Sequence, residues 1–364
     1  MSAWISLNSL IPLAKRGENY LQSTLYFLRI KSFHNDALFN VSYSYNVRES
    51  KRSFLQMGII MRIVSLLPSA TEIICSLGLA DSLVGVSHEC DYPAQVKTLP
   101  KVTTSLIPEA ASSKEIDALV RERLKTSKAL YSLNQSVLQS LKPDFIVTQA
   151  LCDVCAVAEE EVRAVVSKLP GAPQVINLAP MTLAQVFESM LQVGRAVGKE
   201  EHANFVVNAF QNRVDEVVLR SKQMIKNPRV VFLEWLDPPF SSGHWTPELI
   251  AMAGGIELIG RSGQPSRTLE WREVADAKPE MLFIAACGFA VERTMQDLAV
   301  LEKVMMQKEF ASLRPEGVFV ADGSQYFNRP GPKLVDSLEI LAHALDPTIH
   351  PLPAHLQPAT KVNI

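Results

Sequence analysis

Four side chains that can bind metals stand next to one another in the stretch "HECDYP": His88, Glu89, Cys90 and Asp91. The stretch follows the apolar run "SLVGVS", which is typical of a buried β-strand. Cys152 and Cys155 have a C-x-x-C spacing just after another such run, "DFIVTQ". Imidazole and thiolate groups are good ligands for transition metals. One prediction is therefore a metal ion bound by His88, Cys90, Cys152, Cys155 and Cys287.

Both motifs also have simpler interpretations. "HECDYP" can be a loop in which Asp91 caps a turn before Pro93. The two cysteines can be small buried residues at a helix start, or a redox dithiol. No second C-x-x-C or H-x-x-x-H accompanies them, and the chain has no G-x-S-x-G, P-loop or strand-linked G-x-G-x-x-G motif. We therefore predict that the protein is not an enzyme, with thiol-dependent cofactor processing as the less favoured alternative.

Composition narrows the class of partner. The 364 residues are 47% hydrophobic and 20% charged, with a net charge of −2, and no run of like charges exceeds "EEE" at 159–161. No basic face for nucleic acid is indicated. Five cysteines, an odd number, indicate a reducing compartment. The apolar runs are shorter than the roughly 18 residues of a membrane span. We expect a monomer that binds a small molecule, with no nucleic acid and no membrane span.

The elements that must position these side chains follow an α/β pattern. Short β-branched runs alternate with helical periods, which predicts parallel sheets. The predicted strands form two sets, at 63–67, 83–87, 144–149 and 174–178, and at 230–235, 280–286 and 317–323. Within the first set, "PSATE" predicts a capping box between Ser69 and Glu72.

A long helical stretch separates the two strand sets. It runs from 181 to 226 and is broken once, near "AVGKEE"; its second part would be about 40 Å long. The predicted fold is α/β, with two Rossmann-like lobes that each contain a mainly parallel sheet, bridged by one long α-helix. The predicted segments are an N-terminal extension (1–60), an N-terminal lobe (61–180), bridging helices (181–228), a C-terminal lobe (229–346) and a tail (347–364).

Loops at the carboxyl ends of parallel strands bind ligands in open α/β sheets. We therefore expect a cleft between the lobes, with His88 and Glu89 on one side. The second lobe supplies polar and aromatic side chains after its strands: Glu234, Trp235, Trp245, Tyr326 and Phe327. Aromatic rings among a few polar groups suit a planar ligand. The alternative is that Trp235 and Phe327 are core residues.

Residues 1–60 lack the order of a secretory signal. "MSAWISLNSLIPLA" has no positive charge before its apolar part, and Lys15 and Arg16 come after it. Glu18, Asp36 and Glu49 disfavour a transit peptide. The sequence thus predicts an upstream extension with Met61 as the working start, and a cytoplasmic location. Organelle targeting by this segment is left open.

Several phrases in a fixed order resemble one family. "MRIVSLLPSATEIICSLGLADSLVGVSHECDYP", "LKPDFIVTQ", "DPPFSSG", "AKPEMLFI" and "FNRPGPKLVDSLEILAHAL" are similar to the substrate-binding proteins of ABC importers for vitamin B12 and iron chelates. The resemblance covers about residues 61–346, and "SHECDYP" and "YFNRPGP" resemble a cobalamin-binding branch without a signal. It implies two lobes with limited closure, and non-catalytic binding of a corrinoid such as cobalamin, or of another metal chelate, between them.

The resemblance also assigns ligand positions and a partner. The positions that match the family's ligand contacts are Glu89, Ser105, Phe240, Gln325 and Arg329. Glu89 and Ser105 each replace an aromatic residue, which favours a metal chelate or a bare metal ion over cobalamin itself.

Family members dock on a permease through one surface glutamate per lobe. The corresponding positions here hold Ser136 and Arg272, with Glu273 beside the latter. This departure makes an ABC permease partner doubtful.

Overall fold

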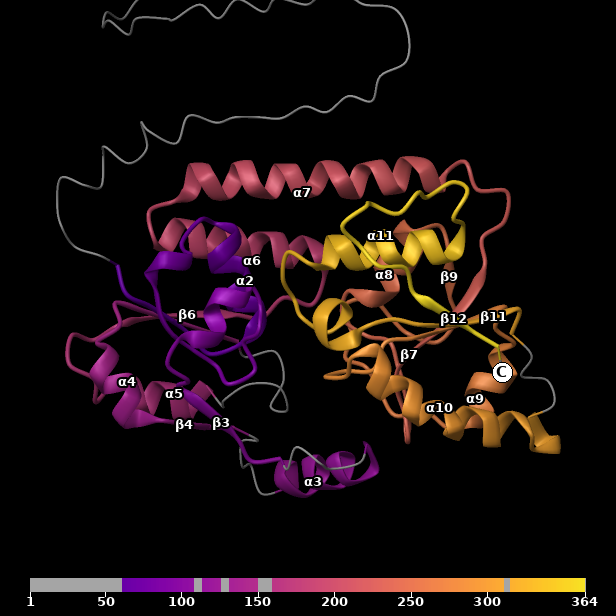
Figure 1. Cartoon of the computed structure of the whole chain (residues 1–364), viewed down its shortest axis with the longest axis horizontal. Helices are drawn as coiled ribbons and strands as arrows, with labels where there is room; N and C mark the ends of the chain where they lie inside the picture. The colour runs from indigo at the N-terminus through magenta and orange to yellow at the C-terminus, as the bar shows by residue number, and fades with distance from the viewer. Residues whose placement is uncertain (1–60, 108–112, 126–130, 150–158, 311–314, 364) are drawn as a thin grey trace, which may run out of the picture. The chain divides into compact units, whose positions relative to one another are not determined.

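The computed structural model describes residues 61–107, 113–125, 131–149, 159–310 and 315–363 (Figure 1). The first sheet in this part of the chain has the order β2-β1-β5-β6, and all its pairings are parallel. Its strands are β1 (Ile63–Ser65), β2 (Leu83–Val86), β5 (Phe145–Gln149) and β6 (Gln174–Leu178). Strands β1 and β5 are largely buried, as expected for parallel strands covered on both faces.

The second sheet has the order β12-β11-β10-β7-β8, and β9 pairs with the other part of β7. Strands β7 (Arg229–Leu236), β10 (Met281–Ile284) and β11 (Gly317–Val320) are parallel. Strand β8 (Pro239–Ser241) folds back antiparallel on β7, and β9 (Ile256–Glu257) pairs parallel with β7. The predicted α/β class with two lobes is confirmed. Strand β12 (Thr360–Val362), antiparallel to β11, was not expected in the segment predicted as a tail.

Helices flank both sheets. Those of the first lobe are α2 (Pro68–Ser76), α4 (Gln135–Leu141) and α5 (Glu159–Val166). Those of the second lobe are α8 (Thr246–Met252), α9 (Trp271–Ala277), α10 (Val291–Met305) and α11 (Leu334–Leu345). The predicted capping box is wrong: helix α2 begins at Pro68, and no side chain caps it. Glu72 instead lies within the helix and is buried.

Two helices connect the lobes. Helices α6 (Leu183–Ala196) and α7 (Glu200–Ser221) lie side by side, and α7 runs across the top of both lobes in Figure 1. At 1.5 Å per residue, the 22 residues of α7 span about 33 Å. Arg213 ties α7 to the second lobe through Asp336 and Glu339 of α11, each at 2.6 Å.

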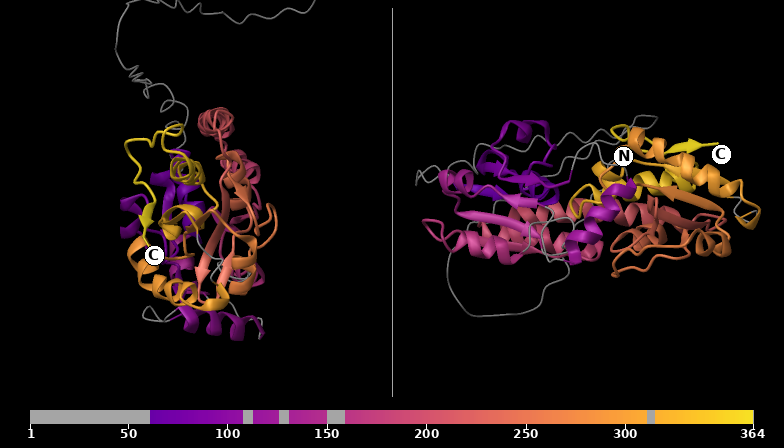
Figure 2. Two further views of the ribbon diagram at one scale, coloured as in Figure 1. Left: turned by 90° about the vertical axis from the view of Figure 1, so that its right-hand side faces the viewer. Right: turned by 90° about the horizontal axis from the view of Figure 1, so that it is seen from below.

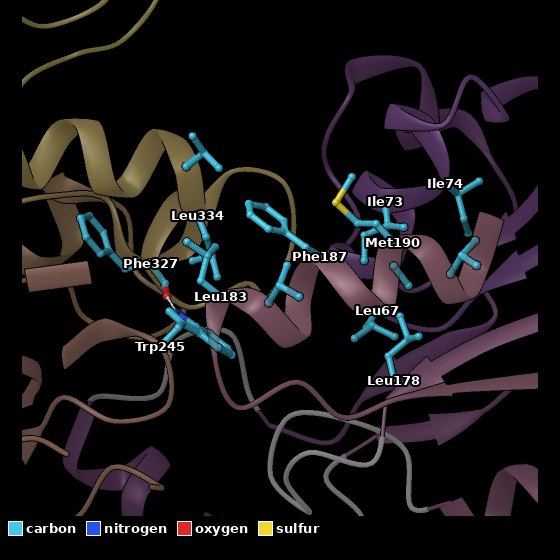
Figure 3. Close-up of a cluster of buried hydrophobic side chains, with 14 of the residues drawn as sticks. Leu67, Ile73, Ile74, Leu178, Leu183, Phe187, Met190, Trp245, Phe327 and Leu334 are labelled. Carbon is cyan, nitrogen blue, oxygen red and sulfur yellow. Dashed lines mark hydrogen bonds between the residues drawn. The ribbon is translucent and has the colours of Figure 1, made fainter. Parts of the chain in front are cut away.

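One hydrophobic core includes side chains from both lobes. In Figure 3, Leu183 of α6 lies near Leu334 of the second lobe, and Met190 lies near Ile73 of the first lobe. All four side chains are at most 2% exposed. A second, smaller cluster belongs to the second lobe alone and includes Val231 and Leu301. The lobes are therefore joined by packed side chains as well as by the chain itself.

A small antiparallel hairpin carries a further helix. Strand β3 (Thr103–Ser105) pairs with β4 (Tyr131–Leu133), and α3 (Ser113–Lys125) lies between them in sequence. Helix α3 lies at the bottom of Figure 1, on the side opposite α7. Among the residues described, no helix is both long and apolar enough to cross a membrane.

Candidate functional site

The loop after β2 is held against the β3–β4 hairpin. The Nδ1 atom of His88 lies 2.7 Å from Oγ1 of Thr103, and burial lowers the pKa of the imidazole. Tyr131 donates its hydroxyl hydrogen bond to Oε1 of Glu89 at 2.8 Å, and its ring lies 5.0 Å from that of His88. His88, Glu89 and Tyr131 thus form a polar and aromatic patch at the carboxyl end of the first sheet.

Charged side chains from both lobes meet where the loops after β2 and β11 come together. Arg329 binds Glu72 of α2 at 3.1 Å and Asp91 at 2.7 Å. Lys333 lies 4.0 Å from Glu72, with its Nζ 3.5 Å from the centre of the Tyr92 ring. We call Glu72, Asp91, Arg329 and Lys333 the inter-lobe ion cluster. It fixes the "HECDYP" loop of one lobe to the other lobe.

Burial and ion pairing shift the pKa values of this cluster in opposite directions. The side chain of Glu72 is 2% exposed, so burial raises its pKa although Lys333 and Arg329 oppose the shift. Burial also lowers the pKa of Lys333. For Asp91, which is half exposed, burial is outweighed by the hydrogen bond and the charge of Arg329, and its pKa falls. Within the described residues, Nζ of Lys333 and Oε2 of Glu72 are buried without a hydrogen-bond partner.

Aromatic side chains gather at the carboxyl end of the second sheet. Trp235 of β7 pairs across the hairpin with Phe240 of β8. The Trp235 ring lies 5.3 Å from that of Phe289, which follows β10. The guanidinium carbon of Arg293 lies 4.6 Å from the centre of the Phe289 ring. Trp235, Phe240 and Phe289 are all partly exposed, as a ligand-stacking surface requires.

The remaining predicted residues of the second lobe are divided between the surface and the interior. Gln325 and Tyr326 lie in η4 (Gly323–Phe327) and are partly exposed, and Lys333 reaches the Tyr326 ring at 5.7 Å. In the first lobe, Ser105 is the last residue of β3 and is also partly exposed. We call the region bounded by the β2 loop, the β3–β4 hairpin, the β7–β8 hairpin and η4 the inter-lobe site.

Trp245 and Phe327 are core residues, contrary to the prediction that they face a ligand. Phe327 is 1% exposed and packs on Phe232 and Phe283 at ring distances of 5.3 Å. Trp245 is 4% exposed and donates its indole N–H to the carbonyl of Phe327 at 2.8 Å. These contacts leave neither ring available to a ligand.

Glu234 is a buried anchor for the loop that follows β8. Its Oε1 accepts a hydrogen bond from the backbone N–H of Gly243 at 3.1 Å. Burial raises its pKa to about 7. Glu257 of β9 holds the next loop through the N–H groups of Ile259 and Gly260, and burial raises its pKa to about 7 as well. Glu234 is therefore a structural residue rather than a group on the accessible surface.

The predicted metal site finds no support in the described part of the chain. No group of three or more His, Cys, Asp or Glu side chains there could hold a metal ion. Cys90 is 2% exposed and lies 3.1 Å from the Thr71 hydroxyl; burial raises its pKa to about 11, which disfavours the thiolate that binds metals. Cys287 is partly exposed after β10. Cys152 and Cys155 lie outside the described residues.

Three aromatic residues of the inter-lobe site were missed. Tyr92 is inside "HECDYP", and Phe289 comes directly after the strand that ends in "ACGF", so their positions after strands were a usable signal. Tyr131 had no such signal, because its contact with Glu89 depends on the β3–β4 pairing.

Comparison with known proteins places this geometry in a family. The chain is 22% identical to the vitamin B12-binding protein of Vibrio cholerae serotype O1 over 281 residues, which cover 76% of this chain and 86% of that protein. It is 24% identical to an uncharacterized ABC transporter substrate-binding lipoprotein, YvrC, of Bacillus subtilis strain 168, over 79% of this chain and 80% of that one.

Solved structures share the fold. The periplasmic vitamin B12-binding protein BtuF of Vibrio cholerae superimposes with a TM-score of 0.56, at 20% identity, covering 78% of this chain and 96% of that one. The apo form of the periplasmic heme-binding protein RhuT of Roseiflexus sp. RS-1 gives a TM-score of 0.57 at 21% identity, covering 79% of this chain and 99% of that one.

The prediction of a cytoplasmic location is wrong. It depended on residues 1–60, which lie outside the described part, and on the odd number of cysteines, whereas the similar proteins are periplasmic proteins or a lipoprotein. These relatives are binding proteins rather than enzymes, which confirms the non-catalytic prediction. Residues 63–315 match the family described as periplasmic binding protein, which is more than half of the sequence. This chain is a member of the periplasmic binding protein family.

Proposed function

We propose that this protein is the substrate-binding component of an ABC importer and that it binds a corrinoid, or another planar metal chelate such as haem, at the inter-lobe site. The observation that carries the proposal is the pairing of Arg329 with Asp91, which brings the loop after β11 against the loop after β2. The strand ends and loops of the two lobes carry rings that are exposed or partly exposed and suit the faces of a macrocycle: Tyr92, Tyr131, Trp235, Phe240, Phe289 and Tyr326. Relatives that bind vitamin B12 or haem add support.

The proposed ligand contacts are the accessible side chains of this region. We assign His88, Glu89 and Ser105 on the first lobe, and Trp235, Phe240, Gln325 and Tyr326 on the second lobe. Arg329 acts through Asp91 by holding the "HECDYP" loop in place, because two carboxylates already occupy its guanidinium. Glu89 would act as a polar group that is oriented by Tyr131.

We also propose a permease partner, which reverses the expectation that such a partner is doubtful, because the relatives include an ABC transporter substrate-binding lipoprotein. Glu273 lies on the first turn of α9 and is partly exposed; its pairing with Arg267 at 2.7 Å lowers its pKa, so it stays charged. It could serve the second lobe in place of Arg272. Ser136 on α4 is exposed and offers a hydroxyl on the first lobe.

Calorimetric titration tests the proposed function. Cyanocobalamin, cobinamide and hemin are each added to the purified protein, and at least one of them should bind with micromolar or tighter affinity. Phe240→Ala should weaken that binding about tenfold, because one stacked ring is worth about 1 kcal/mol or slightly more.

The matched control is Phe205→Ala. Phe205 is on α7, outside the inter-lobe site, and the residue is 67% exposed. Equal losses in the two variants would contradict the assignment of Phe240. Failure of all three compounds to bind the unmodified protein would contradict the proposed function.

A further inference from the structure

Helix α3 crosses from the first lobe to the second. It belongs to the first lobe, because it lies between the paired strands β3 and β4. Polar contacts near both of its ends reach the second lobe. Ser113 donates a hydrogen bond to Oδ2 of Asp297 on α10 at 2.5 Å, and Arg121 donates one to the hydroxyl of Thr268 at 3.0 Å. Seen from below in Figure 2, α3 lies across the region where the lobes meet.

Both ends of α3 are attached next to proposed ligand contacts. Asp297 also binds Arg293 at 2.8 Å, and Arg293 lies on the Phe289 ring that packs against Trp235. At the other end, Thr268 forms a backbone bridge with Phe240. The helix is thus fixed to the aromatic surface of the second lobe while its own strands remain in the first lobe.

The helix carries an apolar face that is not part of either hydrophobic cluster of the described residues. Ile116, Leu119 and Val120 have the spacing of one helical face, and each is only partly buried. Among the described residues, neither hydrophobic cluster includes any of these three side chains. The opposite face is exposed, at Lys114 and Ala118. An apolar face that is half covered and attached beside the aromatic surface is suited to contact with an apolar ligand.

We propose that α3 is a cover for the inter-lobe site, and that its apolar face contacts the macrocycle of a bound corrinoid or haem. This inference rests on the proposed function. In this arrangement α3 detaches to admit the ligand and then reattaches over it, while the two lobes stay together. The shared core and the inter-lobe ion cluster oppose that separation. The hydrogen bonds described between α3 and the second lobe, to Asp297, to Thr268 and from Arg293 to Ser113, are exposed or only partly buried, so detachment of the helix costs less than opening of the lobes.

Dissociation rates measure this role. Protein loaded with cyanocobalamin, cobinamide or hemin is mixed with excess competitor, and ligand release is followed by stopped-flow absorbance. Ile116→Ser with Leu119→Ser should speed release about tenfold, because apolar contact with the ligand is lost. Arg121→Ala with Asp297→Ala should speed it to a similar extent by freeing the helix.

Two control variants match these changes. Ala118→Ser alters the exposed face of α3, and Arg272→Ala with Asp276→Ala removes an exposed Arg–Asp pair on α9. Both should release the ligand at the rate of the unmodified protein. Hydrogen exchange on the unmodified protein gives an independent readout, in which amides 113–125 should exchange more slowly once ligand is bound.

The outcomes separate the two proposals. If none of the compounds binds the unmodified protein, the proposed function fails and the cover fails with it. If a compound binds but its release is unchanged in both double variants, or if α3 gains no protection, the cover is overturned and the proposed function stands.

Discussion

Replacement of Arg329 by methionine is expected to lower the free energy of unfolding by about 3 to 5 kcal/mol. The reason is Glu72, whose carboxylate is 2% exposed and would lose its closest cationic partner. Lys333 is 4.0 Å away and, like Glu72, is penalised by burial, so it compensates poorly. Asp91 is half exposed and contributes little to the loss of stability, because water can solvate its carboxylate once Arg329 is gone. Urea unfolding at neutral pH, followed by circular dichroism, measures the loss.

A second substitution separates charge from packing. Glu72→Gln combined with Arg329→Met removes the stranded charge, and it should recover a large part of the loss. Arg272→Ala serves as the surface control, because its pairing with Asp276 is more than half exposed on both sides and is worth about 0.5 kcal/mol or less. A loss below about 1 kcal/mol in Arg329→Met would show that the ion cluster does not hold the lobes together.

Glu234 should make the stability of the protein depend on pH. Burial raises its pKa from 4.5 to about 7 in the folded state, so the folded protein binds the proton more tightly than the unfolded chain does. Stability from this group is therefore complete below pH 4.5, falls as the pH rises toward 7, and stays low above 7. A shift of this size corresponds to about 3 kcal/mol. Glu257 has a similar shift and adds to the effect.

Glu234→Gln tests this prediction, because an amide does not ionise but can still accept the hydrogen bond from Gly243. The variant should be more stable than the unmodified protein at pH 8, by up to about 3 kcal/mol, and nearly equal to it at pH 4.5. Urea unfolding at several pH values gives the comparison. Glu201→Gln is the control, because Glu201 is exposed on α7. Its free energy of unfolding should differ from that of the unmodified protein by the same amount at every pH. An unchanged difference between pH 4.5 and 8 would contradict the role of burial.

The fold was largely predictable because its signals are local. The runs around Ile63, Val231 and Phe283 are continuous apolar stretches, and such stretches indicate buried parallel strands. The break between α6 and α7 coincides with the polar "GKEE", which is also visible in the sequence. Strand β12 was not predicted, because its pairing with β11 is long-range and its three residues are mostly exposed.

The site was less predictable, because position after a strand does not reveal the direction of a side chain. Trp235 lies near the end of β7 and Trp245 follows β8, yet Trp235 is partly exposed and Trp245 is in the core. The role of Arg329 could not be read from its neighbours, because its partner Glu72 is 257 residues away in the sequence. Cys90 illustrates the same limit: its residue type suits a metal, but its burial beside Thr71 does not.

The continuous core around α6 makes the two lobes one thermodynamic unit. Leu183 and Met190 contribute to the interior of different lobes from a single helix, so neither sheet can lose its packing without exposing side chains of the other. Heating should therefore produce one cooperative transition for residues 61–363 rather than one for each lobe. A ligand bound mainly to the surface of one lobe would raise the melting temperature of both. Thermal-shift screening of metal chelates would thus report occupancy of this site through the whole fold.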